Sequence, residues 1–386
     1  AGDVRLHTRS DRRSNAEPPT RRVDPIGRDH DAGADGSPGH VRGTDSPAVG
    51  RGESSERFRT VGRRTRLSPA VGVFLSQPGR NEGMPAAPEP GTADPLALRG
   101  VVPPTVTAFD ADGAVDHEAT AAHAQFVVDG GANGVFPLGT NGEFPLLTGA
   151  ERREVVETVT DAVDAPVIAG VGAPSTRETV DNATHAASTG ADGVVVVTPY
   201  YYPLDAEAAV RHYRAVAEAV DVPVYVYHIP SKTGNELSLS TLDRLAAIEG
   251  VVGVKDSSKD VPWLAQAIDA HPELTFLAGS DSLLFPGLEI GCSGVVSAVA
   301  NVFPELVVDL YDAYDAGDEA EARRLQSTVF EVRSALKRGP YMAGVKTALS
   351  LRDLNFDAGG LRAPLRTMDD EGRAALRTDL QGLGLL

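Results

Sequence analysis

A lysine that ends a valine-rich run is the residue of this chain best suited to covalent chemistry. The run is GVVGVK, 250–255, and Lys255 is one of only five lysines among 386 residues. Such runs are typical of strands buried on both faces of a parallel sheet. An amine between apolar walls has a lowered pKa, so we expect Lys255 to form a Schiff base with a carbonyl substrate. The alternative is a strand-end lysine whose ammonium reaches solvent.

Other polar groups stand where apolar runs end. The loop Gly139–Glu143, GTNGE, follows one run, Tyr227 ends another just before HIPSKTG, and three tyrosines, 200–202, follow a third. None of these groups suits a simple core position. If the runs are parallel strands, their C-terminal ends meet at one edge, so these groups and Lys255 predict a single site.

The elements that would position this site are apolar runs alternating with amphipathic stretches. We expect strands at 100–109, 134–139, 166–172, 193–200, 223–229, 251–255, 274–279 and 294–300. We expect helices at 116–129, 149–163, 175–188, 206–219, 240–247 and 261–270. Eight such units predict an α/β fold, a (β/α)₈ TIM barrel over residues 96–303, because a doubly wound sheet usually has fewer strands.

Only helical patterns follow residue 303. They cover 304–316, 319–337 and 342–351, and a last one starts at 369. We therefore expect a C-terminal helical extension over residues 304–386. Its apolar faces could close a subunit interface or pack on the barrel, and periodicity alone does not separate the two.

The first part of the chain has a different composition. Residues 1–83 hold 15 Arg, no Lys and 11 acidic residues, whereas the remaining 303 hold 21 basic and 43 acidic residues, a net charge of −22. We expect residues 1–95 to be a disordered low-complexity tail. Interleaved acids disfavour a nucleic-acid arm, and no apolar core suits a secretory signal. Because the first methionine is Met84, we favour upstream sequence that is not normally translated.

The acidic balance predicts a halophilic protein. Few lysines and a net charge of −22 are typical of proteins in cytoplasm of very high salt, although an ordinary acidic protein is the alternative. No run approaches the length of a membrane span, and the one cysteine, Cys292, excludes an intrachain disulfide. We expect a cytoplasmic protein without nucleic-acid or membrane partners, and a packed, inert thiol at Cys292.

Other chemistries find little support. The six histidines after Met84 form no ligand cluster, no GxGxxG follows the first run, and neither a Walker sequence nor a nucleophile elbow is present. We therefore expect no metal and no cofactor. A non-enzymatic barrel stays an alternative, but it has no need of Lys255.

Three motifs together carry a family resemblance. GTNGE, YHIPSKTG and GVKDSS, in this order, resemble the signatures of the dihydrodipicolinate synthase and N-acetylneuraminate lyase superfamily of pyruvate-dependent class I aldolases, from about Leu98 to the C-terminus. The resemblance implies that Lys255 forms the Schiff base and that Tyr227 is the acid–base group. It implies that Thr140 links Tyr227 to Tyr201 of a neighbouring subunit, in a homotetramer built as a dimer of dimers.

The resemblance also implies a set of substrate-binding residues: Gly139, Asn141, Gly142, Glu143, Lys232 and Ser297. Small residues let backbone N–H groups approach a substrate carboxylate. Two positions depart from the family pattern. Asn141 stands where a second hydroxyl residue is common, and Lys232 stands where dihydrodipicolinate synthases have an arginine. Lysine is a mobile point charge that could meet hydroxyls or a phosphate, or pair with a surface acid.

These departures favour one activity over another. We expect a lyase of carbohydrate metabolism that cleaves 2-keto-3-deoxygluconate or its 6-phosphate to pyruvate and glyceraldehyde or its 3-phosphate. The alternative is a 4-hydroxy-tetrahydrodipicolinate synthase, which condenses pyruvate with aspartate semialdehyde in lysine biosynthesis. Because both share every pyruvate-handling residue, only Asn141 and Lys232 separate them in the sequence.

Overall fold

Seven short parallel strands form one curled sheet. The computed structural model describes residue 96 and residues 98–386, so the expected tail lies outside the described residues. The strands are β1 (Gly100–Val101), β2 (Ile168–Gly170), β3 (Gly193–Val197), β4 (Val224–His228), β5 (Val251–Asp256), β6 (Thr275–Ala278) and β7 (Gly294–Val295). Their order is β1-β7-β6-β5-β4-β3-β2, and every neighbouring pair is parallel. The fold is therefore an α/β fold of the TIM-barrel type.

The run expected as the second strand, 134–139, forms only one bridge, between Val135 and Val167. The segment 133–139 nevertheless bonds to both edges of the sheet, since Asn133 N donates to Val101 O (2.8 Å) and Ile168 N donates to Val135 O (3.0 Å). Pro137 lacks an N–H, and Leu138 has a left-handed backbone with φ of 59°. Neither residue continues a regular ladder, which explains why this strand is shorter than expected.

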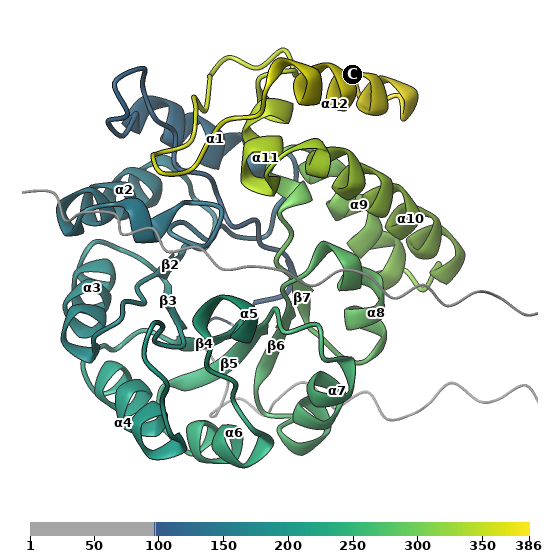
Figure 1. Ribbon diagram of the computed structural model, residues 1–386. Helices are drawn as coiled ribbons and strands as arrows, with labels where there is room; N and C mark the ends of the chain where they lie inside the picture. The colour runs from purple at the N-terminus through teal and green to yellow at the C-terminus, as the bar shows by residue number, and fades with distance from the viewer. Residues whose placement is uncertain (1–95, 97) are drawn as a thin grey trace, which may run out of the picture. The chain divides into compact units, whose positions relative to one another are not determined.

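Helices surround the strands as a ring (Figure 1). The helices that follow the strands are α1 (His117–Asp129), α2 (Gly149–Ala162), α3 (Thr176–Ser188), α4 (Ala206–Ala217), α6 (Leu239–Ala246) and α7 (Val261–Ala270), close to the expected bounds. Two short helices were not expected, namely α5 (Pro230–Thr233) and α8 (Leu284–Glu289). The strand interiors explain the parallel sheet, because all residues of β3 and β4 are buried.

Short polar side chains fix the helix starts. The N-cap side chains that accept a backbone N–H are Asp116, Thr148, Ser175, Asp205, Ser238, Asp260, Asp318 and Asp369. Each such cap stabilises its helix by about 1 kcal/mol. A carboxylate at this position also complements the positive end of the helix dipole.

Four further helices lie together at one side of the ring (Figure 1): α9 (Pro304–Asp315), α10 (Glu319–Ala335), α11 (Tyr341–Leu349) and α12 (Asp370–Gly382). Gln326 joins α10 to the segment after β6, because its Nε2 donates to Asp281 O (2.9 Å) and its Oε1 accepts from Phe285 N (2.9 Å). These helices therefore reach the C-terminal ends of the strands. Among the described residues, no helix is both long and apolar enough to cross a bilayer.

Candidate active site

The C-terminal ends of β4 and β5 bring Tyr227 and Lys255 together. Strand pairing sets the two residues opposite each other, and each is 4% exposed. Lys255 Nζ lies 3.5 Å from the centroid of the Tyr227 ring and 5.9 Å from that of Phe136. Paired residues of adjacent strands lie on the same face of a sheet, so the register itself puts the amine against the phenol.

Hydrogen bonds hold the Tyr227 hydroxyl, which lies 3.2 Å from Thr140 Oγ1. Burial raises the pKa of this phenol, but the charge of Lys255 and hydrogen bonds with Lys255, Thr140 and Ser257 outweigh burial. The pKa of Tyr227 therefore lies below its ordinary value. A phenol with a lowered pKa exchanges protons more readily near neutral pH.

The loop after the second run combines close packing with a free donor. A Cβ on Gly139 would lie 3.1 Å from the Phe136 ring, and one on Gly142 would lie 3.1 Å from backbone atoms. Asn141 is buried, and within the described residues its Nδ2 amide has no hydrogen-bond partner. A buried donor without a partner is suited to a substrate carboxylate oxygen.

Glu143, expected to bind substrate, is buried and forms an ion pair within the protein. Its Oε1 lies 3.0 Å from Lys346 Nζ, and its Oε2 accepts the backbone N–H of Arg362 (3.0 Å). It does not line the cavity that contains Lys255. It lines a second, adjoining cavity, and these partners hold its carboxylate, so substrate contact by Glu143 stays a prediction.

A cavity of about 220 Å³ contains Lys255. Five of the predicted residues line it: Thr140, Asn141, Tyr227, Lys232 and Lys255. Side chains that sequence reasoning missed also line it: Ser257, Lys259, Asp281, Arg333 and Tyr341. The last two come from α10 and α11, so the C-terminal helices form part of this wall.

Basic groups gather at this cavity. Lys232, Lys259 and Arg333 line it with Lys255. Lys337 stands nearby, since the charge of Arg333, then burial and Lys259, lower the pKa of Lys337. Four of the five lysines of the chain therefore lie at or beside one cavity. Their scarcity in an acidic chain was the signal that could have identified Lys259 and Lys337 from the sequence.

Ser297, expected to bind substrate, does not line the cavity, although its neighbours Val296 and Ala298 do. It is fully buried, and its Oγ donates to Asp281 Oδ1 (2.7 Å). The other oxygen of Asp281 accepts from the Tyr341 hydroxyl (2.6 Å). The Ser297 hydroxyl already donates to Asp281, and substrate contact by Ser297 stays a prediction.

Tyr201 lies apart from Tyr227 within this chain. Its side chain is 84% exposed, its φ is 83°, and its ring packs at 5.0 Å on that of Tyr202. Asn235 fixes the loop, because its Nδ2 donates to Pro199 O and Tyr202 O, both at 2.9 Å. The loop thus presents Tyr201 outward in a fixed conformation.

A second cavity of about 250 Å³ adjoins the first. Both are lined by Thr140, Ile229 and Lys232. The remaining wall of the second is mostly apolar and includes Phe144, Tyr200, Met342 and Leu365. This cavity reaches Thr140, whose Oγ1 lies 3.2 Å from the Tyr227 hydroxyl, and Lys255 does not line it.

A buried pair follows the two reactive residues. His228 Nδ1 lies 2.9 Å from Asp256 Oδ1, and His228 Nε2 accepts the Leu237 N–H (3.2 Å). Since Nε2 accepts, Nδ1 carries the proton and donates to Asp256. The pair links β4 to β5 one residue beyond Tyr227 and Lys255, and so stabilises their register.

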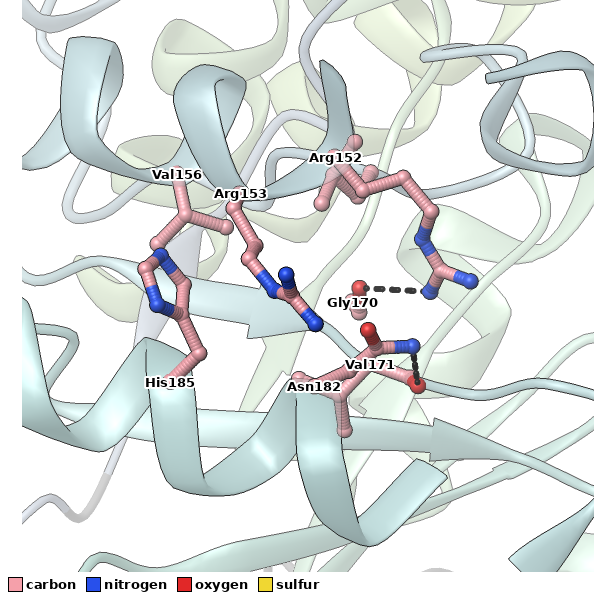
Figure 2. A pocket seen from close by; sticks show the side chains of 8 residues that line it. Arg152, Arg153, Val156, Gly170, Val171, Asn182 and His185 are labelled. Carbon is pink, nitrogen blue, oxygen red and sulfur yellow. Dashed lines mark hydrogen bonds between the residues drawn. The ribbon is translucent and has the colours of Figure 1, made fainter. Parts of the chain in front are cut away.

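Two other features carry no chemistry of this kind. Figure 2 shows a pocket lined by Arg152, Arg153 and His185. Its volume of about 10 Å³ has room for about one water. Cys292 is buried, and burial raises the pKa of its thiol to about 12, as expected of a packed thiol. In residues 98–386, no group of three or more His, Cys, Asp or Glu side chains is arranged to hold a metal.

Comparison with known proteins extends these observations. Residues 97–383 match the model of the dihydrodipicolinate synthetase family. An uncharacterised DapA-like lyase of Halobacterium salinarum is 72% identical over 302 residues, which are 78% of this chain and 99% of the relative. A 4-hydroxy-tetrahydrodipicolinate synthase of Natronomonas pharaonis is 38% identical over 287 residues, which are 74% of this chain and 97% of the relative.

Solved structures agree with these relatives. YagE, a prophage protein of the dihydrodipicolinic acid synthase family from E. coli in complex with pyruvate, superposes with a TM-score of 0.72 at 34% identity, covering 75% of this chain and 99% of that one. KD(P)GA from T. tenax superposes with a TM-score of 0.69 at 30% identity, covering 74% of this chain and 99% of that one. With the paired Lys255 and Tyr227 at the strand ends, these findings show that the chain is a lyase of the dihydrodipicolinate synthetase family, within the class I pyruvate-dependent aldolases.

Proposed function

We propose that the chain cleaves a 2-keto-3-deoxy sugar acid to pyruvate and an aldehyde through a Schiff base on Lys255. The contact between Lys255 and Tyr227, with Nζ 3.5 Å from the ring centroid, is the observation that carries the proposal. It supplies a nucleophilic amine and a proton-transfer group at one point. Asn141 Nδ2 supplies a donor for the carboxylate of the 2-keto acid.

The reaction follows from these positions. Lys255 Nζ attacks the C2 carbonyl and water leaves, which gives a protonated imine. The Tyr227 phenolate then takes the proton of the C4 hydroxyl, the C3–C4 bond breaks, and its electron pair moves into the imine to form an enamine as the aldehyde leaves. Protonation at C3 and addition of water to the imine release pyruvate and restore the amine.

The relay beyond Tyr227 is proposed to cross a subunit boundary. Thr140 Oγ1 lies 3.2 Å from the Tyr227 hydroxyl, and the second cavity leads to Thr140 from outside. Tyr201 is exposed and held in a fixed loop. A neighbouring chain that inserts its Tyr201 would complete a relay from Tyr227 through Thr140, in a homo-oligomer that we propose to be a dimer of dimers.

The basic groups favour a substrate with a second anion. Lys232, Lys259 and Arg333 lie along the cavity wall, and none of them has a carboxylate within ion-pair distance in the described part of the chain. Free ammonium and guanidinium groups suit a phosphate at the end of the substrate far from the keto group. We therefore favour 2-keto-3-deoxy-6-phosphogluconate over the free sugar acid.

A second activity has support of its own. Curated relatives 37% and 38% identical to this chain are named 4-hydroxy-tetrahydrodipicolinate synthase. Condensation of pyruvate with aspartate semialdehyde would use the same Lys255, Tyr227 and Thr140. Lys232 distinguishes the two, because an ammonium grips a planar carboxylate less specifically than a guanidinium does.

The decisive experiment combines trapping with a comparison of substrates. With pyruvate and borohydride, the protein should gain one covalent adduct per chain, located on Lys255 by peptide mapping, and Lys255→Met should abolish adduct and turnover. Turnover of 2-keto-3-deoxygluconate, its 6-phosphate, and pyruvate with aspartate semialdehyde is then measured in parallel at high salt. An adduct on another lysine refutes the mechanism, and faster condensation than cleavage establishes the second activity.

A further inference from the structure

The ion pair between Glu143 and Lys346 is unlike the others in this structure. Glu143 Oε1 lies 3.0 Å from Lys346 Nζ, and the side chains of Glu143 and Lys346 are 0% and 3% exposed. Every other Lys or Arg pair with a carboxylate among residues 98–386 has at least one side chain exposed by 23% or more. Burying two charges costs desolvation energy that their attraction often fails to offset, so stability alone does not account for this pair.

Glu143 ends the loop that carries Thr140 and Asn141. Its backbone is left-handed, with φ of 53° and ψ of 31°, a conformation that an L-residue adopts at a cost. Its N–H donates to Thr140 O (3.2 Å), while Thr140 Oγ1 meets Tyr227 and the Asn141 amide is free. The backbone of Glu143 is therefore bonded to Thr140, whose side chain meets Tyr227.

Lys346 belongs to α11, far from this loop in sequence. Its Nζ also donates to Gly360 O (2.7 Å) and lies 4.2 Å from the centroid of the Phe109 ring. The backbone N–H of Arg362 donates to the second oxygen of Glu143 at 3.0 Å. Both carboxylate oxygens of Glu143 are thus held by residues of the C-terminal part of the chain.

We propose that Glu143 and Lys346 are positioning residues, through which the C-terminal helices hold the loop Gly139–Glu143 in the geometry that receives the carboxylate of the 2-keto acid. Neither residue lines the cavity around Lys255, and only Glu143 lines the adjoining second cavity. The inference rests on the proposed pyruvate chemistry. It explains why a carboxylate next to an anion-binding loop does not repel the anion, since Lys346 neutralises it.

The test separates position from stability. Lys346→Met alone leaves a buried carboxylate unpaired and should unfold more easily, whereas the double variant Glu143→Gln, Lys346→Met replaces the pair with neutral groups and should recover stability to urea. If the pair positions the loop, the double variant should still need about tenfold more pyruvate for half-maximal borohydride trapping on Lys255. A purely structural pair would give wild-type half-saturation, and that result overturns the proposal.

The control breaks an exposed ion pair in the same C-terminal region. Arg338→Met removes the contact with Asp379 at 2.6 Å and should leave half-saturation by pyruvate unchanged. If the double variant does not fold, the same trapping experiment is made with Lys346→Arg. This variant keeps both charges, but its larger guanidinium group displaces Glu143. The pyruvate concentration for half-maximal trapping should then rise severalfold, and a wild-type value overturns the proposal. If the wild-type chain itself traps no pyruvate, the proposed function fails first and this inference with it.

Discussion

Lys255 faces an aromatic ring and other cations, with no carboxylate within ion-pair distance among the described residues. The face of the Tyr227 ring attracts a positive charge. The protonated imine that we propose on Lys255 would be such a charge, and it would have to persist while the C3–C4 bond breaks. The ring can therefore stabilise the intermediate while its hydroxyl moves the proton.

The basic side chains that line the cavity around Lys255 give a prediction at the scale of single residues. Arg333→Ala and Lys259→Ala should each raise KM for the 6-phosphate by about 10- to 100-fold, equivalent to roughly 1–3 kcal/mol, since each removes a charged partner of the phosphate. The ratio of KM between phosphorylated and free sugar acid is the quantity to measure. Arg323→Ala is the matched control, because this arginine lies on the same helix but packs over Phe285. An unchanged ratio in both variants would assign the cations to another role.

At the scale of elements, α1 contacts the segment after β7 through a buried histidine. His123 is 0% exposed, and its Nε2 lies 3.1 Å from Asn301 O. Desolvation by burial lowers the pKa of His123 from 6.5 to about 4. Between these pH values the unfolded chain binds a proton that the folded chain does not. The contribution of His123 to the unfolding free energy is therefore fully present above pH 6.5 and is lost as the pH falls toward 4.

This sign gives a prediction for acid stability. His123→Gln should flatten the dependence of the unfolding free energy on pH between 6.5 and 4, where this histidine alone removes about 3 kcal/mol. Urea unfolding at several pH values measures the slope. The control is the same substitution at His117, a half-exposed histidine at the start of the same helix. A slope that changes equally in both variants, or in neither, contradicts the assignment.

At the scale of the whole molecule, the exposed Tyr201 predicts that activity belongs to an assembly. Tyr201→Phe should lower turnover by about 100-fold, because it breaks the proton relay at Thr140. Lys255→Met should abolish turnover. When the two variants are reassembled together, activity should return, since sites with Lys255 from one chain and Tyr201 from another are then complete.

The outcome is measured as turnover before and after mixing. Tyr202→Phe in place of Tyr201→Phe is the control, because its ring packs beside Tyr201 and the proposal gives it no role in the relay. Mixed assemblies without regained activity, formed by chains that do exchange, would place the whole relay within one chain.

The distribution of charge also acts at this scale. The residues from Met84 onward carry a net charge of −22, yet four of the five lysines lie at or beside the cavity around Lys255. An anionic substrate is repelled by the surface as a whole and attracted at this one point. The few basic groups are thus concentrated where a bound anion needs them.

Sequence periodicity determined the order of strands and helices and the place of the chemistry. The valine-rich runs 193–197 and 251–254 form strands, and in a parallel sheet their C-terminal ends meet on one side. Lys255, Tyr227 and Thr140 were therefore predictable as neighbours. The run 134–139 forms one bridge and no full strand, because Pro137 and the left-handed Leu138 interrupt its hydrogen bonding.

Only the tertiary structure decided the roles of groups that meet across long stretches of chain. Glu143 has the sequence context of a substrate ligand, and its partner Lys346 follows about 200 residues later. Ser297 likewise donates to Asp281, and Arg333 reaches the cavity from a helix outside the barrel run. The sequence determined the order of the strands and the polar residues near their C-terminal ends, because hydrophobic periodicity is local. Which of them face the substrate and which face a buried partner depends on packing between distant segments, which no local pattern encodes.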